Sequence, residues 1–319
     1  MRCLHCGKEI SSHAELTEQK NRWHRRCIKK FFGTKELPML DITEEQLEQL
    51  ANDTVNQGLT VPGVQRKMSI HLSTDIDTKL TIVDYPTGYI LKPQTKEYEN
   101  LPEYEDLSMR MAEVAGIQTV PHALMRMNDQ YAYITRRIDR DIQGKQITMY
   151  AMEDFCQLAE RLTADKYRGS YELCARIIKR HSILPGFDLS ELFLRLVFSF
   201  LTGNSDMHLK NFSLREQESG KRNFCLSKAY DMLPVNVIIP EDQEQLALTL
   251  NGKKRNIRKK DFITFAEKCD IPVKSAEKII RKVCSLKEKF IKACDESYLP
   301  EMKKEEMKQL ITCREEILQ

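Results

Sequence analysis

A carboxylate and an amide lie close together between Gly203 and Asn211, where the chain reads Gly-Asn-Ser-Asp-Met-His-Leu-Lys-Asn. Four residues separate Asp206 from Asn211. A carboxylate can accept or orient the proton of an attacking hydroxyl, and an amide oxygen can hold a metal ion beside a phosphate. The pair therefore indicates phosphoryl transfer, with Asp206 in the first role and Asn211 in the second.

Phosphoryl transfer also needs a second carboxylate to bind the metal, and it should follow a short strand or hairpin after this loop. Asp231, in Ala229-Tyr-Asp231, lies at that place. Lys210 is a candidate for neutralising charge on the γ-phosphate, because it sits in the same loop as the catalytic carboxylate. His208 is either a nucleotide contact or a polar loop residue satisfied by the backbone, since kinases need no histidine base there.

A lysine should clamp the α- and β-phosphates from a strand. The segment Tyr89-Ile-Leu-Lys92 is similar to the Val-Ala-Ile-Lys strand of protein kinases, which places Lys92 in that role. Its ion-pair partner should lie on the next helix. Glu105 is the first choice because it would point back toward the phosphates, and Glu103 is the alternative.

A loop over the phosphates is expected at Thr60-Val-Pro-Gly-Val-Gln-Arg-Lys67, directly before the first strand. It is not a Gly-x-Gly-x-x-Gly motif. Gly63 alone is weak evidence, since isolated glycines mostly serve turns, but backbone amides can bind phosphate without a full glycine motif.

The elements that must position these residues follow from hydrophobic periodicity. A Thr43-Glu-Glu-Gln46 capping box predicts a short helix ending near Asn52, after which Gly58 to Gly63 interrupts regular structure. Strands are predicted at 67–72, 80–83, 88–91 and 131–135, and helices at 103–115, 189–201, 273–295 and 301–318. From Glu153 onward the period is mainly that of helices.

This order of elements predicts an α+β protein with a two-lobed, protein-kinase-like fold: a small β-rich N-lobe and a helical C-lobe. The expected divisions are a metal-binding knuckle at 1–35, the N-lobe at 36–140 and the C-lobe at 141–319. We find no internal repeat and no low-complexity tract.

The N-terminal segment carries two close pairs of metal-binding residues, Cys3-x-x-Cys6 and His24-x-x-Cys27. Their types and spacing are typical of a tetrahedral structural zinc site and resemble the first half of a LIM-type finger. Trp23, Phe31 and Phe32 are expected to pack beneath the metal, and His5 or His13 could substitute as ligands. The alternative is a flexible terminus with free thiols.

Composition limits the other possibilities. In 319 residues, 50 basic side chains nearly balance 47 acidic ones, so a net charge of +3 gives no general indication of nucleic-acid binding. The basic run from Lys253 to Lys260 is either a solvated face or a contact for DNA or a tRNA-bound substrate. No long apolar run or secretory signal is found, so we expect a cytoplasmic protein without a membrane segment, with reduced cysteines from Cys156 to Cys313.

Five motifs in order resemble the HipA family of bacterial toxin kinases, over about residues 55 to 270. They are Pro-Gly-Val-Gln (62–65), Ile-Leu-Lys-Pro (90–93), Arg-Ile-Asp-Arg (137–140), Asn-Ser-Asp-Met-His-Leu-Lys-Asn (204–211) and Ala-Tyr-Asp-Met (229–232). The resemblance implies a serine/threonine protein kinase that uses ATP and Mg²⁺. It also implies the roles of several residues. Asp206 would be the catalytic base, Lys92 would clamp the phosphates, and the backbone of Arg136, Arg137 and Ile138 would recognise adenine. The phosphate loop would consist of Pro62, Gly63, Val64, Gln65, Arg66 and Lys67, and the nucleotide and metal would be surrounded by His208 to Asn211 with Tyr230 and Asp231.

The resemblance further implies partners and regulation. Substrates would be aminoacyl-tRNA synthetases, and a small HipB-like antitoxin would hold the toxin and link it indirectly to DNA. Autophosphorylation would fall on Thr60, although serine is commoner at that position. The family's long members carry about 100 more N-terminal residues, so this chain resembles a short HipT-like form, in which a separate HipS-like subunit supplies that part.

Three other functions fit parts of the pattern. A catalytically silent module would bind ATP or an antitoxin without transfer, but every catalytic residue type is present. A DNA-associated corepressor would bind DNA tightly and with strong salt dependence, which the near-neutral charge disfavours. A small-molecule kinase would share the Asp-x-x-x-x-Asn loop, but not the Pro-Gly-Val-Gln and Ile-Leu-Lys-Pro motifs.

Overall fold

The computed structural model describes residues 1–42, 67–73, 78–81, 87–143 and 146–319. They form two compact units. The first contains residues 1–106 and 121–137 and the second contains 107–120 and 138–319, so the N-terminal cysteine segment belongs to the same unit as the lysine strand. The expected helix after Thr43, the interruption at Gly58 to Gly63, Thr60 and residues 62–66 of the phosphate loop lie outside the described residues.

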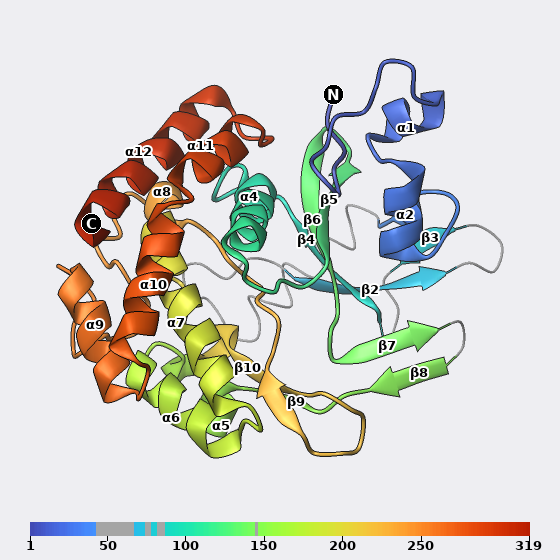
Figure 1. Cartoon of the computed structure of the whole chain (residues 1–319). Helices are drawn as coiled ribbons and strands as arrows, with labels where there is room; N and C mark the ends of the chain where they lie inside the picture. Colours follow the sequence, from blue (N-terminus) through green and yellow to red (C-terminus); the bar gives the residue numbers. More distant parts are fainter. Residues whose placement is uncertain (43–66, 74–77, 82–86, 144–145) are drawn as a thin grey trace. The chain divides into compact units, whose positions relative to one another are not determined.

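A six-stranded sheet forms the centre of the first unit, with strand order β1-β3-β2-β4-β6-β5 (Figure 1). Neighbouring strands are antiparallel, except that β1 and β3 are parallel. The strands are β1 (Met39–Asp41), β2 (Met68–Ser73), β3 (Lys79–Thr81), β4 (Tyr89–Pro93), β5 (His122–Met127) and β6 (Gln130–Arg136). Ile70, Leu91, Ala123 and Ile134 are fully buried on these strands.

Among the described residues, the helices of the first unit are α1 (Leu16–Asn21), α2 (Arg25–Phe32) and the beginning of α4 (Leu101–Ala115). The predicted strands at 67–72, 88–91 and 131–135 correspond to β2, β4 and β6. Strand β5 was not predicted, because its first four residues, His122 to Met125, are all buried and give no alternation of polar and apolar side chains.

The second unit is mainly helical and is built around α7 (Pro185–Thr202), which packs against three other helices (Figure 1). All of its residues from Leu192 to Thr202 are buried, as expected for a helix in the middle of a core. Its neighbours are α6 (Tyr171–His181), α10 (Val273–Cys284) and α12 (Glu301–Leu318). The remaining described helices are α5 (Phe155–Leu158), α8 (Val235–Ile238), α9 (Lys259–Lys268) and α11 (Lys287–Asp295), with 3₁₀ turns η1 (Thr163–Asp165) and η2 (Leu209–Asn211).

The second unit also contains two small sheets, of which only a short strand or hairpin between the loop of Asp206 and Asp231 was expected. Strands β9 (Met152–Asp154), β10 (Ser213–Glu216) and β11 (Phe224–Leu226) form one antiparallel sheet in the order β11-β10-β9. Strands β7 (Arg140–Gln143) and β8 (Gln146–Met149) form a hairpin. Strands of three or four residues give too few alternations to be recognised in a sequence. The β10–β11 pair separates the loop of Asp206 from Asp231.

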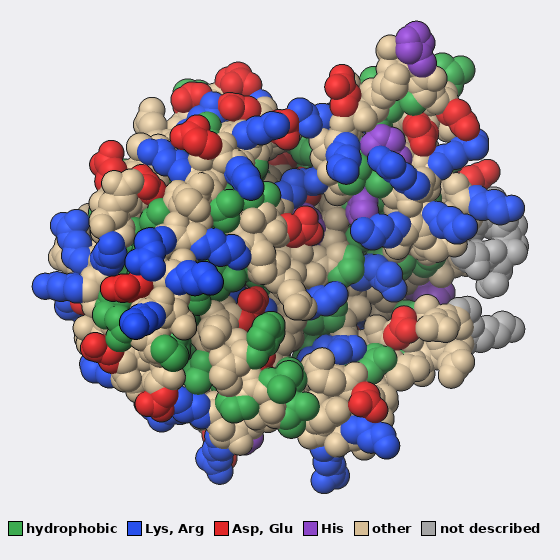
Figure 2. All heavy atoms as spheres, viewed as in Figure 1, with side chains coloured by type: hydrophobic (Ala, Val, Ile, Leu, Met, Phe, Trp, Pro, Cys, Tyr) green, Lys and Arg blue, Asp and Glu red, His purple; other side chains and the backbone are tan. Residues whose placement is uncertain are grey.

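Charges of both signs are mixed on the face that Figure 2 draws. Lys and Arg side chains are interspersed there with Asp and Glu (Figure 2). In the basic run, Lys253 Nζ pairs with Asp261 at 2.7 Å and Lys254 Nζ with Glu244 at 3.0 Å. None of the described helices is both long enough and apolar enough to cross a lipid bilayer.

Candidate active site

Lys92 and Glu105 form a buried ion pair in the first unit. Lys92 Nζ lies 2.5 Å from Glu105 Oε1, and the two residues are 3% and 0% exposed. The ammonium also lies 5.3 Å from the centroid of the Tyr133 ring, which faces it from β6. Such a pair is costly to desolvate and must be held by geometry, so β4 and the first turns of α4 fix the lysine in one position.

The alternative partner, Glu103, has a different neighbour. Its Oε1 accepts a hydrogen bond from Asn100 Nδ2 at 3.2 Å. Burial raises the pKa of the Glu103 carboxyl above its ordinary value. The structure therefore pairs Lys92 with Glu105.

His122 and Asp106 form a second buried polar pair in the first unit. His122 Nδ1 is 3.3 Å from Asp106 Oδ1, and the His122 ring stacks on Tyr133 with centroids 5.8 Å apart. Tyr133 thus contacts both the lysine and the histidine. Sequence reasoning missed this layer, because nothing in the spacing of His122 and Asp106 relates β5 to α4.

The loop with Asp206 begins where α7 ends, in the second unit. Gly203 closes the helix in the left-handed conformation, at φ 71°. A side chain at this position would have its Cβ 2.6 Å from Leu310 Cδ2, so Leu310 would have to shift, and the left-handed conformation itself favours glycine.

Hydrogen bonds within the loop orient Asp206 and Asn211. The Asp206 amide donates to Asn204 Oδ1 at 3.1 Å, and Asn211 Nδ2 donates to the Asp206 carbonyl at 2.8 Å. Asn211 is buried. Because its amide nitrogen is used inside the loop, its Oδ1 is the atom with which Asn211 would hold a cation.

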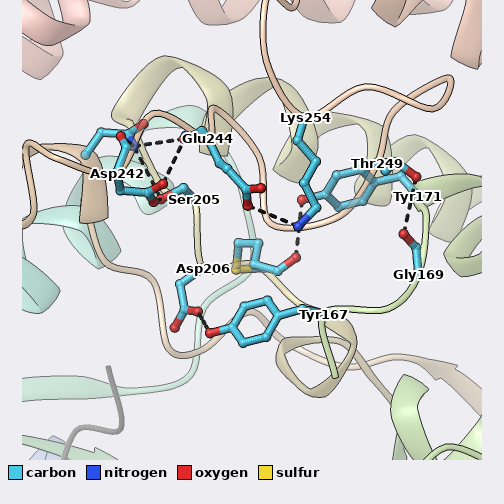
Figure 3. A network of polar contacts seen from close by, with 11 residues as sticks. Tyr167, Gly169, Tyr171, Ser205, Asp206, Asp242, Glu244, Thr249 and Lys254 are labelled. Carbon is cyan, nitrogen blue, oxygen red and sulfur yellow. Dashed lines mark hydrogen bonds and ion pairs between the residues drawn. The ribbon is translucent and has the colours of Figure 1, made fainter. Parts of the chain in front are cut away.

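Tyr167 is a functional candidate that the sequence did not reveal. Its hydroxyl donates to Asp206 Oδ1 (Figure 3). Its ring packs edge-on against His208 with centroids 4.9 Å apart. Burial raises the pKa of the Tyr167 hydroxyl, and the charges of Asp206, its hydrogen-bond acceptor, and of Asp231 raise it further. Tyr167 therefore stays protonated and donates a hydrogen bond to the carboxylate.

A second set of hydrogen bonds holds Ser205, the residue before Asp206. Ser205 Oγ donates to Asp242 Oδ2 at 2.6 Å, and the Glu244 amide donates to Asp242 Oδ1 at 2.9 Å (Figure 3). Asn236 Nδ2 bridges the carbonyls of Asp242 and Glu244 at 3.2 and 2.9 Å. The segment that follows α8 thus supports the loop.

Asp231 has a backbone conformation that few side chains adopt. Its φ is 61°, in the left-handed region, which Asp and Asn tolerate better than most residues. The preceding Tyr230 is fixed by its hydroxyl, which donates to the Lys210 carbonyl at 3.1 Å and lies 2.5 Å from Ser213 Oγ. Tyr230 thereby ties Asp231 to the loop of Asp206 and Asn211.

Lys210 has a partner on another element. Its Nζ lies 3.2 Å from Asp154 Oδ2, and its side chain is 36% exposed. Asp154 also caps α5, with Oδ1 accepting the Gln157 amide at 2.9 Å. The structure thus shows an ion pair for the lysine that was predicted to act on the γ-phosphate.

The segments proposed for phosphate and adenine recognition are described only in part. Lys67 lies directly before β2 with an exposed side chain. The Arg136 amide donates to the Pro121 carbonyl at 3.0 Å and the Arg137 amide to the Gly88 carbonyl at 2.9 Å. The Ile138 carbonyl accepts a bond from the Arg215 guanidinium.

The N-terminal cysteine pairs come together in space. The ligand atoms of Cys3, Cys6, His24 and Cys27 lie within 4.8 Å of one another. His5 packs instead on Trp23, with ring centroids 5.5 Å apart.

Comparison with known sequences decides the family. Residues 59–290 match the family described as "HipA-like C-terminal domain". The chain belongs to this family. A Haemophilus influenzae protein described as "Putative kinase" is 25% identical over 270 residues, which cover 77% of each chain. The "Putative kinase Y4dM" of Sinorhizobium fredii is 30% identical over 232 residues, covering 67% of this chain and 54% of the relative.

Solved structures show the same fold. The structure of the Shewanella oneidensis MR-1 toxin–antitoxin complex of HipA, HipB and operator DNA matches with a TM-score of 0.69 and 19% identity, covering 81% of this chain and 64% of that chain. The Helicobacter pylori proinflammatory kinase CtkA matches with a TM-score of 0.54 and 18% identity, covering 78% and 90%.

The HipA-like chain thus has an α+β fold similar to these kinases, and its family and relatives support a kinase-like activity. It spans about half to three quarters of the length of the curated relatives named above.

Proposed function

We propose that this HipA-like chain is an ATP- and Mg²⁺-dependent serine/threonine protein kinase. The observation that carries the proposal is the buried Lys92–Glu105 ion pair at 2.5 Å. A lysine on a strand paired with a glutamate on the following helix is the phosphate clamp of protein kinases. In the proposal, Lys92 holds the α- and β-phosphates, with the backbone amides of residues 62–67 as the phosphate loop and the backbone of residues 136–138 beside adenine.

Asp206 accepts or orients the proton of the acceptor hydroxyl. The Tyr167 hydroxyl keeps this carboxylate in one orientation, and the Asn211–Asp206 bond keeps the loop closed. Catalysis would then come from positioning and charge stabilisation, without a covalent intermediate. His208 and Tyr230 support the loop, and Lys210 would have to leave Asp154 to reach a phosphate.

The proposed ligand atoms in the second unit are suited to Mg²⁺. Asp231 offers carboxylate oxygens and Asn211 an amide oxygen, which are ligands that Mg²⁺ prefers. Asp206 and Asp231 both add negative charge around Tyr167, so the second unit concentrates the charge that a cation would offset. When bound, Mg²⁺ would neutralise charge on the β- and γ-phosphate oxygens. The cofactors of the proposal are ATP, Mg²⁺ and a structural Zn²⁺ held by Cys3, Cys6, His24 and Cys27.

The substrate and partners are proposed from the family. A toxin kinase of this kind would phosphorylate a translation protein such as an aminoacyl-tRNA synthetase. The likeness to HipA in its complex supports a HipB-like antitoxin as partner, with DNA bound through it. A HipS-like subunit is a further proposed partner. Phosphorylation of Thr60 would place negative charge next to the phosphate loop and oppose nucleotide binding.

Intact-mass spectrometry with phosphopeptide mapping tests the proposal. The wild-type chain and Asp206→Asn are incubated with Mg²⁺-ATP, alone and with purified aminoacyl-tRNA synthetases. We expect added phosphate on Thr60 or on a synthetase with the wild type and none with the variant. ATP binding without any transfer would instead support the silent binding module, and transfer only to small molecules would support a small-molecule kinase.

A further inference from the structure

We propose that Cys3, Cys6, His24 and Cys27 hold one structural zinc ion that fastens residues 1–33 to the strand carrying Lys92, so that removing the metal weakens ATP binding. The metal site stands on its own geometry. Its effect on ATP rests on the role proposed above for Lys92.

The distances between ligand atoms fit a tetrahedral zinc. With Zn–S near 2.3 Å and Zn–N near 2.0–2.1 Å, sulfur and nitrogen should lie about 3.6 Å apart. The observed distances are 3.4 Å from Cys6 Sγ to His24 Nδ1 and 3.8 Å from Cys27 Sγ to the same nitrogen. Three thiolates and one imidazole complete the shell, so no position is left for a water or a substrate.

A second observation points to His24 as a ligand. Its other ring nitrogen, Nε2, lies 3.3 Å from the Glu9 carbonyl. A carbonyl only accepts, so Nε2 carries the proton and the lone pair of Nδ1 points at the three sulfurs. Metal-binding histidines in proteins are held in this way by an acceptor on the far nitrogen. The His24 amide also donates to Cys3 Sγ at 3.4 Å, as expected for a thiolate.

The segment is too small to fold by apolar burial alone. Its helices α1 and α2 have six and eight residues, and α1 buries none of its side chains. Segments of this size usually need a metal or disulfides, and all three cysteines here are free thiols. The metal would therefore supply the folding free energy of residues 1–33.

Aromatic side chains join this segment to β4. The Tyr89 ring packs on Phe31 and Phe32 with centroids 5.9 and 5.5 Å apart, and the Tyr89 hydroxyl donates to the Phe31 carbonyl at 3.3 Å. Phe31 and Phe32 in turn pack on Trp23, which is adjacent to His24. Tyr89 lies three residues before Lys92 on the same strand.

Two hydrogen bonds extend the contact across the sheet. The Leu124 amide donates to the Leu4 carbonyl at 3.0 Å, which covers part of the edge strand β5. Arg22 Nη1 donates to the Tyr131 hydroxyl on β6 at 2.5 Å. Strands β4, β6 and β5 are neighbours in the sheet and carry Lys92, Tyr133 and His122. Residues 1–33 therefore contact all three strands.

Metal analysis of the full chain tests the site. We expect one zinc per chain, and the Co²⁺-substituted protein should show the intense visible absorption of tetrahedral cobalt with thiolate ligands. His24→Ala and Cys27→Ser should lower zinc affinity by at least about 100-fold, since even outer-shell changes cost 10–100-fold. His13→Ala, which changes an exposed histidine of the same segment, should keep the metal. Wild-type protein without zinc, or full zinc in His24→Ala, would overturn the site.

ATP affinity measured with and without zinc tests the coupling. A zinc-selective chelator that leaves Mg²⁺ in solution should weaken ATP binding by about 5-fold or more and lower the melting temperature. By linkage, ATP must raise zinc affinity by the same factor. Equal ATP affinity in both forms would overturn the coupling and leave the kinase proposal intact. If the zinc-loaded chain bound no ATP, the proposed function would fail, while the zinc content would still test the metal site.

Discussion

Asp206 and Asp231 are held in part by groups that lie far from them in the sequence. Tyr167 reaches Asp206 from the loop after η1, and Tyr230 fixes the position of Asp231 through the Lys210 carbonyl. The Asp-x-x-x-x-Asn spacing was sufficient to find Asp206 and Asn211. It could not reveal Tyr167 or Asp242, because their contacts depend on how distant segments pack.

Two substitutions at Asp231 can distinguish the effect of its charge from the effect of its left-handed backbone conformation. Asp231→Asn should keep the fold, since Asn tolerates a φ of 61°, and should lower kcat/KM on the order of 10²–10³-fold by removing a metal-binding charge. Asp231→Ala should lose activity and about 1–2 kcal/mol of stability as well. Kinase assays at several Mg²⁺ concentrations and thermal unfolding measure both effects. Full activity in Asp231→Asn would exclude Asp231 as a metal ligand.

Tyr167 should affect turnover more than nucleotide binding. Tyr167→Phe removes a hydrogen bond to a carboxylate, a contact of about 1.5–3 kcal/mol, so we expect kcat to fall roughly 10–100-fold with little change in KM for ATP. Tyr150→Phe, whose ring lies under the Arg215 guanidinium at 3.9 Å, is the matched control and should leave kcat unchanged. A change in KM alone would contradict the positioning role.

At the scale of elements, the sequence predicted the longer elements, whose hydrophobic period is sustained, and missed several short strands. Helices α7 and α12 and strands β2, β4 and β6 correspond to predicted segments, and the helix predicted at 273–295 is divided into α10 and α11. Strand β9 was missed, whereas the β10–β11 hairpin lies where a short strand or hairpin was expected, between Asn211 and Asp231. The buried β5 strand was missed for lack of alternation.

Helix α4 carries a carboxylate whose burial predicts a pH effect. The pKa of Glu103 is raised above its ordinary 4.5, mainly by burial, so the folded chain binds the proton more tightly than the unfolded chain. This contribution to stability is fully present below the ordinary pKa and is lost as the pH rises through the raised value. Glu103→Gln should therefore be more stable than wild type at neutral pH, with the difference shrinking toward pH 4.

Thermal unfolding across this pH range measures the effect. Glu99→Gln, an exposed carboxylate just before the helix, is the control and should follow the wild-type curve. A Glu103→Gln profile parallel to wild type would show that Glu103 titrates normally in the folded chain.

At the scale of the whole molecule, the groups that the proposed kinase requires for phosphoryl transfer are divided between two compact units. The first unit holds the Lys92–Glu105 pair with the cysteine segment, and the second holds Asp206, Asn211 and Asp231. Sequence motifs predicted the family, which the match over residues 59–290 shows. Motifs could not predict that the cysteine segment packs on β4, because that contact depends on Tyr89 and the two phenylalanines.

Transfer of labelled γ-phosphoryl from Mg²⁺-ATP to protein, in wild type and Asp206→Asn with ATP affinity measured for both, tests the central claim most directly. We predict label on a serine or threonine with the wild type, and a loss on the order of 10³-fold or more in the variant at similar ATP affinity. Equal transfer by both proteins, or binding of ATP with no transfer to any protein, would contradict the assignment of a protein kinase.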